Sequence, residues 1–173
     1  MARRKNALRV HEIAPFDPSQ PNKVPGTEAW LKLAKYIETV SDESDEETDD
    51  TGFYDGDGTP EETVTSVVGG YSFEGHYDPE DKAQALIASM KYKTGDGRRV
   101  WLRVTSSDKK KTWTQLANVS EIKAGDGDAT EYEAFECTIK FIKTPVEAAV
   151  VGGSHPTRVR GLKFPRASVP RTK

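Results

Sequence analysis

The densest group of potential metal ligands lies in the stretch Asp55-Gly-Asp57-Gly, which is followed by Glu61 and Glu62. Carboxylates at alternate positions resemble the calcium loop of an EF-hand, which also requires a third oxygen ligand at a fixed spacing and a helix on each side. That third ligand is missing here, and no two flanking helices are evident. We therefore expect no metal site in this stretch.

Zinc and nucleophile chemistry lack the necessary partners as well. His11, His76 and His155 lie far apart, and none has a cysteine or a second histidine at metal-ligand spacing. The single cysteine, Cys137, alternates with apolar residues, which predicts a buried and inert thiol. There is no nucleophile elbow and no phosphate-binding glycine loop. We expect a protein that is not an enzyme and that needs no cofactor.

Trp101 lies between Arg99 and Arg103, a combination that could bind nucleic acid. Against this, the net charge is -3, and residues 38–62 hold twelve Asp and Glu with no Lys or Arg. Such a stretch would repel phosphate, so stable binding of nucleic acid is not expected. Six bases lie in residues 152–173 and four in the first eleven residues. Opposite charges on separate segments suit head-to-tail contact between copies, although three simply solvated segments would look the same.

The chain is long enough for one domain with a core, but its hydrophobic fraction of 35% is low. We divide it into a proline-rich N-terminal arm (1–27) with a short strand near residues 8–13, a β-domain (28–145) and a C-terminal arm (146–173). Within the β-domain, residues 41–62 should form a long, solvated acidic loop. No apolar run is long enough to span a membrane, and the N-terminus does not resemble a secretory signal.

Strand patterns dominate the β-domain. Residues 28–40 fit both a strand and a helix, and we favour the strand because the surroundings are β-rich. Residues 64–77 predict a long strand that bends at Gly69-Gly70, and residues 98–123 predict a hairpin with Trp101 facing outward. Residues 131–143 alternate apolar and polar side chains, as in a strand with one buried face.

One helix is expected, over about residues 78–92. Asp78 can cap it, and Pro79 suits the first helical position. An apolar stripe then follows at helical spacing and should cover the sheet; it consists of Ala83, Leu86, Ile87 and Met90. The expected fold class is therefore mainly β, a sandwich or barrel with one flanking helix, a long acidic loop and extended arms.

Several runs resemble the major tail (tail tube) proteins of long-tailed, non-contractile bacteriophages. The resemblance covers roughly residues 28–145 and rests on the order of the elements and on the general residue pattern of the segments, not on a short diagnostic motif. The runs are TVTSVVGGYSFEGHYDPED (63–81), ALIASMKY (85–92) and RVWLRV (99–104), with YDGDG (54–58) before them and YEAFECTI (132–139) after them.

This resemblance implies a structural virion protein. Six copies would form a ring, strands would join edge to edge into an inner barrel, and stacked rings would make the conduit for DNA ejection. The implied partners are the tape-measure protein, the tail terminator and the distal tail protein. DNA would pass through without specific binding, and no membrane is involved. The implied location is the virion tail, with assembly in the host cytoplasm.

The same picture assigns roles to charged residues. A lumen that carries DNA should be acidic or neutral, because fixed cations would hold phosphates. The candidates for lining the lumen are Glu74, Glu131, Glu133 and Glu136. The acidic candidates for contacts between rings are Asp42, Glu43, Asp45, Glu46, Glu47, Asp49 and Asp50, and their candidate basic partners are Arg98, Arg99, Lys109, Lys110, Lys111, Arg158, Arg160 and Lys163.

Two alternative functions remain open. One is a carbohydrate- or receptor-binding β-sandwich with Trp30, Trp101 and Trp113 on an exposed groove, and the other is a different tail component, such as a terminator or distal tail protein.

Overall fold

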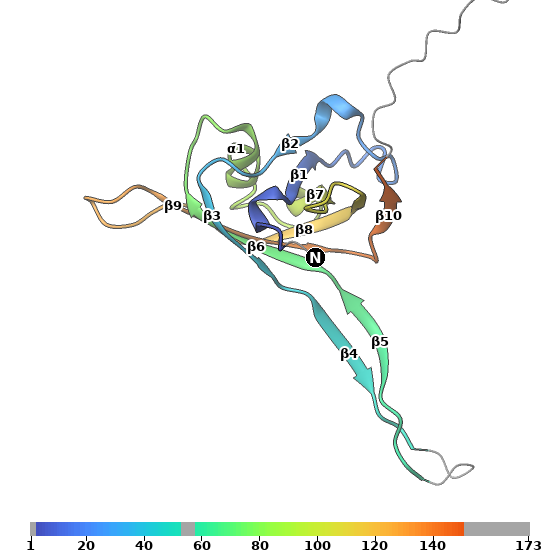
Figure 1. Ribbon diagram of the computed structural model, residues 1–173. Helices are drawn as coiled ribbons and strands as arrows, with labels where there is room; N and C mark the ends of the chain where they lie inside the picture. The colour runs from blue at the N-terminus through green and yellow to red at the C-terminus, as the bar shows by residue number, and fades with distance from the viewer. Residues whose placement is uncertain (1–2, 53–57, 151–173) are drawn as a thin grey trace, which may run out of the picture.

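The computed structural model describes residues 3–52 and 58–150 (Figure 1). In this part of the chain one α-helix accompanies a set of mostly short strands and three 3-10 turns. The elements are η1 (Asn6–Leu8), β1 (Val10–Pro15), η2 (Thr27–Ala29), β2 (Leu31–Lys32), β3 (Ile37–Asp42), β4 (Asp45–Asp49), β5 (Thr63–Val68), β6 (Gly70–His76), α1 (Lys82–Ala88), η3 (Gly95–Arg98), β7 (Arg99–Thr105), β8 (Lys111–Asp126), β9 (Ala134–Phe141) and β10 (Val146–Ala149).

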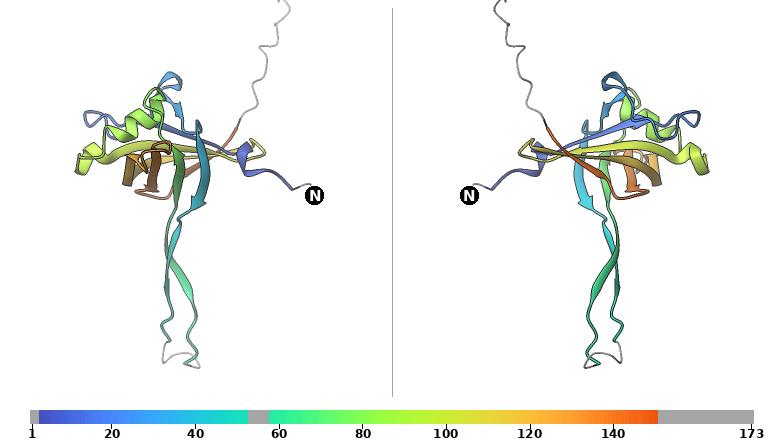
Figure 2. Two further views of the ribbon diagram at one scale, coloured as in Figure 1. Left: turned by 90° about the vertical axis from the view of Figure 1, so that its left-hand side faces the viewer. Right: turned by 90° about the vertical axis from the view of Figure 1, so that its right-hand side faces the viewer.

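The strands form one large antiparallel sheet and one separate hairpin. The sheet has the order β2-β1-β7-β8-β9-β6-β3, and β10 pairs with the start of β8. β4 and β5 pair only with each other and project from the rest of the molecule as a long twisted hairpin (Figures 1 and 2). The fold is therefore mainly β with one helix, as predicted.

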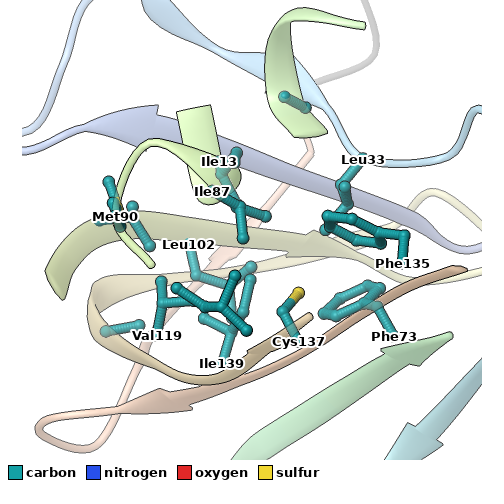
Figure 3. Packing of buried hydrophobic residues seen from close by; sticks show 14 of the residues in the cluster. Ile13, Leu33, Phe73, Ile87, Met90, Leu102, Val119, Phe135, Cys137 and Ile139 are labelled. Carbon is teal, nitrogen blue, oxygen red and sulfur yellow. The ribbon is translucent and has the colours of Figure 1, made fainter. Parts of the chain in front are cut away.

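The hydrophobic core lies between one face of the sheet and α1. Ile87 of the helix packs over Phe73, Phe135 and Ile139 of the sheet, and these four side chains have no or almost no exposed surface (Figure 3). Cys137 lies in the same cluster, as its alternation predicts, and burial raises the pKa of its thiol. The predicted one-faced strand over residues 131–143 is thus confirmed as β9.

Two segments that we expected to be arms belong partly to the sheet. β1 pairs along its whole length with β7, and Ile13 and Ala14 are completely buried. The six residues of β1 therefore form part of the domain. We predicted a short strand near residues 8–13, but assigned it to an arm outside the domain. At the other end, β10 adds four paired residues after Pro145, where no strand was expected. Residues 151–173 of the predicted C-terminal arm lie outside the described residues.

The acidic segment also differs from the expectation. We predicted a loop over residues 41–62, but Asp45–Asp49 form β4, which pairs in antiparallel register with β5. Every residue of both strands is exposed, so the carboxylates remain in water, and strand pairing does not require their burial. Gly69 separates β5 from β6, which confirms the predicted bend at Gly69-Gly70.

The helix is shorter than predicted. It begins at Lys82, and its cap is Asp81, whose carboxylate accepts hydrogen bonds from the N–H groups of Ala83 (3.0 Å) and Gln84 (2.9 Å). Asp78, the predicted cap, instead pairs with Lys35 and accepts from the N–H of Glu80 within the preceding turn. The predicted apolar stripe does face the core.

Residues 28–40 form no α-helix. They hold the end of η2, all of β2 and the first part of β3, in line with the favoured strand interpretation. The hairpin of β7 and β8 is also confirmed. Trp101, however, was expected to face outward and is only 6% exposed. It lies on the sheet face opposite the core, where Pro21 and Val24 of the preceding connection lie beside it.

Candidate assembly and lumen surfaces

The sheet face opposite the helix is polar over β3, β6, β9 and the second half of β8. Strand register places its side chains in rows across the four strands. One row consists of Ser41, Ser72, Thr138 and Ser120, and the next consists of Thr39, Glu74, Glu136 and Lys123. This face is polar because side chains alternate between the two faces of each strand. The residues between these positions, such as Phe73, Cys137 and Val119, point into the core.

Two predicted lumen residues meet on this polar face. Glu74 and Glu136 are direct cross-strand partners, and Lys123 forms an ion pair with Glu136. The hydrogen bond from its ammonium to Glu136 raises the pKa of Lys123, which stays charged. A second base, Lys140, and two more acids, Glu121 and Asp126, belong to the same surface, so the polar face carries charges of both signs with more acids than bases.

The other two predicted lumen residues lie elsewhere. Glu131 and Glu133 precede β9 in the loop that follows β8, beyond the end of the paired strands. This loop protrudes from one end of the sheet in Figure 1. The structure therefore brings Glu74 and Glu136 together and leaves Glu131 and Glu133 outside the polar face.

The β4–β5 hairpin has two different faces. Its register pairs Asp45 with Val68, Glu47 with Ser66 and Asp49 with Thr63 on one face. Glu46 with Val67 and Thr48 with Val64 make up the other, and Thr65 is the extra residue of a bulge. Hence three carboxylates share the first face, and two exposed valines, Val64 and Val67, share the second.

The carboxylate face of the hairpin continues the polar face of the sheet. The Ser72 hydroxyl, on the polar face, donates to the carboxylate of Glu43 (3.1 Å), and the Ser66 hydroxyl donates to Glu47 (3.1 Å). Alternation from Glu43 through Asp45, Glu47 and Asp49 then keeps these acids on one side. Of the other predicted contact residues, Asp42 accepts from the N–H and hydroxyl of Ser44, and Asp50 follows β4.

Most of the described basic residues predicted to meet these acids already have partners within the chain. The guanidinium of Arg98 donates to the carbonyls of Lys93 (2.7 Å) and Lys91 (2.7 Å), where it closes the turn after α1. Arg99 pairs with Asp96 at 2.8 Å, and Lys111 pairs with Glu147 at 2.7 Å. Lys109 and Lys110 are exposed in the β7–β8 turn. Arg158, Arg160 and Lys163 lie outside the described residues.

The cluster of Trp101, Arg99 and Arg103 is likewise structural. Arg103 donates to Glu12 on the neighbouring strand at 2.8 Å, and its guanidinium stacks 4.2 Å from the ring centroid of Trp30. Arg99 lies 5.8 Å from the ring of Phe16. These contacts fasten the N-terminal segment to β7, so they account for a pattern that on sequence alone could indicate nucleic-acid binding.

An aromatic hollow of about 540 Å³ opens at the end of β6 and β9 that is remote from the hairpin. Its lining residues are Tyr36, His76, Tyr77, Tyr132 and Glu133. The rings of His76 and Tyr132 meet edge to face at 5.7 Å, and the N–H of Tyr77 donates to the carbonyl of Glu133. Sequence analysis missed this hollow because its residues come from three separate segments.

Within residues 3–52 and 58–150, no group of His, Cys, Asp and Glu is arranged to hold a metal ion. No helix in the same ranges is long and apolar enough to cross a membrane.

No protein-family model and no curated protein matches the sequence. Solved structures do match. The tail of an empty GTA particle with C6 symmetry has a TM-score of 0.61 at 13% identity, covering 85% of this chain and 100% of the other. The SPP1 tail tube has a TM-score of 0.57 at 12% identity, covering 92% and 95%. This chain has the tail tube fold. The virion of a native gene transfer agent agrees, with a TM-score of 0.60 at 12% identity.

The tail tube fold includes more of the chain than the sequence resemblance did. The resemblance covered roughly residues 28–145, whereas the structural matches extend over 85–92% of the chain. This extension agrees with the pairing of β1 and β10 into the sheet. At the level of the fold, the resemblance drawn from the sequence is confirmed.

Proposed function

We propose that this chain is a structural tail tube protein that forms stacked hexameric rings and encloses the conduit for DNA ejection. Its role is assembly rather than catalysis. The finished protein resides in the virion tail and is assembled in the host cytoplasm. The tape-measure protein, the tail terminator and the distal tail protein are its proposed partners.

The observation that carries this proposal is that the sheet, which has the tail tube fold, has one apolar face and one polar face. One face buries the core under α1, whereas the other is a broad polar surface that no described element covers across β3, β6 and β9. Such a surface suits the wall of a water-filled channel. Its excess of acid over base, extended by Glu43, Asp45, Glu47 and Asp49, would let DNA pass without being held.

The sheet edge at β3 supports contact between neighbours in a ring. β3 is the last strand in the sheet order, and its outer edge has no partner strand within the described part of the chain. Unpaired edges readily add a strand from another copy. We propose that this edge pairs with the next subunit, so that the inner sheet becomes continuous around six copies.

Negative-stain electron microscopy of the purified chain tests the proposal. We expect rings or tubes with six-fold symmetry and a stain-filled bore. A chain that remains a small folded monomer at all concentrations would refute the proposal. The carbohydrate-binding alternative gains no support, because Trp101 is buried and Trp113 donates its indole N–H to Glu147.

A further inference from the structure

The valine face of the hairpin is an apolar surface without a partner in the described structure. Val64 and Val67 are about half exposed, at 52% and 49%, and sit beside Thr48 and Glu46 on the same face. A solitary two-stranded hairpin is at best marginally stable in water. A hairpin of this length therefore calls for an external surface against which its apolar side can pack.

The aromatic hollow is the complementary feature at the opposite end of the same strands. The hairpin leaves the sheet after Asp42 of β3 and returns before Gly70 of β6. The hollow adjoins the other ends of these strands, next to the register pair of Ile37 and Gly75. Two complementary features at opposite ends of one subunit produce a head-to-tail contact that repeats without limit.

The exposed aromatic rings give the hollow a large contact area. Tyr132 is 82% exposed and Tyr36 is 58% exposed, although both have rings that could bury much apolar surface. Tyr36 also adopts a φ of 56°, a left-handed conformation that is uncommon for a tyrosine and that sets its position at the start of β3. The backbone conformation of Tyr36 thus positions one ring of the hollow.

The charges around the aromatic hollow determine which face of the hairpin can pack into it. The end of β8 and the loop that follows it, which supplies one wall of the hollow, carry Asp126, Asp128, Glu131 and Glu133, all of them exposed. The carboxylate face of a hairpin would place Asp45, Glu47 and Asp49 beside these acids and be repelled, whereas the paired residues of the valine face include one acid, Glu46. Beside the hollow, the ammonium of Lys35 lies 5.3 Å from the ring centroid of Tyr36.

We propose that the hollow receives the valine face of the β4–β5 hairpin from a second copy of this chain, in the adjacent ring. The inference rests on the proposed function, since it names the contact that joins one ring to the next. It is a different contact from the salt bridges between rings that we predicted from the sequence. The acids of the hairpin point toward the bore, and the contact itself is apolar and aromatic.

Disulfide trapping between two separately purified variants tests this contact. One variant is Val67→Cys and the other is Tyr132→Cys; both positions are exposed, and the native Cys137 is buried. The control replaces Val67→Cys with Val68→Cys, which lies on the carboxylate face of the same hairpin. After mixing, assembly and mild oxidation, we expect a covalent dimer from the first pair and only background from the control pair.

A second variant tests the same contact without new cysteines. The double substitution Val64→Thr and Val67→Thr keeps the shape and strand preference of both side chains but makes them polar. We expect it to fold with an unchanged circular dichroism spectrum and to lose tube formation, while Val68→Thr still forms tubes. Tubes from the double variant would contradict the inference.

The outcomes separate the two proposals. If the wild-type chain forms rings or tubes and both cysteine pairs cross-link equally, the hollow is not the binding site, and the proposed function stands. If the wild-type chain forms neither rings nor tubes, the proposed function fails and the inference fails with it. Preferential trapping through Val67→Cys supports both.

Discussion

Glu74 and Glu136 face each other on adjacent antiparallel strands, at the centre of the polar face of the sheet. Like charges in this relationship destabilise a sheet, and only Glu136 has an ion-pair partner, Lys123, among the described contacts. In a solitary domain this pair has no evident benefit. In a channel wall it places negative charge where DNA would pass, which is a reason to keep both carboxylates.

Neutralising one member of this pair should stabilise the monomer. We expect Glu74→Gln to raise the free energy of unfolding by ~0.2–1 kcal/mol, because it removes a cross-strand repulsion. Urea unfolding at low and high salt measures the effect, which should shrink as salt screens the repulsion in the wild type. Glu28→Gln, an exposed acid in η2, serves as the control and should change little. An unchanged or lower stability for Glu74→Gln would contradict this account.

His11 links the stability of the fold to pH. It is 5% exposed, its Nε2 has no hydrogen-bond partner among the described residues, and its ring meets those of Tyr71 and Phe73 edge to face at 5.2 Å. Burial, with a smaller effect of Arg9, lowers the pKa of His11 from 6.5 to about 4. The imidazole is therefore neutral in the folded protein near pH 7.

The sign of the pH dependence follows from this shift. Between pH 6.5 and pH 4 the unfolded chain binds a proton at His11 that the folded protein does not. Stability is therefore complete above pH 6.5 and falls as the pH drops toward 4, by about 3 kcal/mol in total. Chemical denaturation across this range should show the loss, and His11→Phe should flatten it. Equal slopes for His11→Phe and the wild type would assign the pH dependence to other groups.

The sequence predicted those elements whose pattern is local. The alternation of Phe135, Cys137 and Ile139 identified a one-faced strand, and the stripe with Ile87 identified the helix that covers it. The bend at Gly69-Gly70 was also clear. In each case the apolar spacing alone determines which face is buried, so no knowledge of distant segments was needed.

What the sequence missed depends on distant partners. A short strand near residues 8–13 was predicted, but not its place in the sheet, because β1 lies in a proline-rich segment and pairs with β7, about 90 residues away. β4 has five exposed residues, four of them acidic, so no hydrophobic pattern marks it, and it exists because β5 pairs with it. Trp101 alternates like an exposed residue, but Pro21 and Val24 of the connection after β1 and Val146 of β10 lie beside it on that face.

For the candidate site, the sequence predicted a polar sheet face, but not which charged residues lie on it or which of them already have partners within the chain. Glu74 and Glu136 were selected because both lie on strands with a polar side, and the register shows in addition that they are cross-strand partners. Glu133 was selected for the same reason but lies in a loop, because the predicted strand began a few residues too early. The bases Arg98 and Arg99 looked available for other subunits until their partners within the chain were visible.

The cap of α1 offers a direct test of the corrected helix start. Asp81→Ala should lower the free energy of unfolding by ~0.5–2 kcal/mol, because it removes the acceptor for two N–H groups of the first turn. Asp81→Asn keeps a capping oxygen and should cost much less. Thermal or urea unfolding of both variants measures the difference. If both lose the same amount, the charge of Asp81 rather than its cap would be responsible.

Gln84 is a buried polar residue that fastens the helix to two strands. It has no exposed surface, and its side-chain amide donates to the carbonyls of Lys35 (2.7 Å) and His76 (3.2 Å). Its carbonyl oxygen accepts from the N–H of Asp78 at 2.7 Å. One side chain thus satisfies three backbone groups that would otherwise be without partners where β3, β6 and α1 meet.

Replacing Gln84 with leucine should therefore be costly even though the site is buried. We expect Gln84→Leu to lower the free energy of unfolding by at least ~1–3 kcal/mol, because the backbone groups it served lose their hydrogen bonds. Lys82→Leu, on the exposed side of the same helix, is the matched control and should stay within ~0.5 kcal/mol of the wild type. Urea unfolding of both variants measures the two changes in the free energy of unfolding. If Gln84→Leu were as stable as the control, water or backbone movement would have to replace the three bonds, and the amide would not be what holds the helix against the ends of β3 and β6.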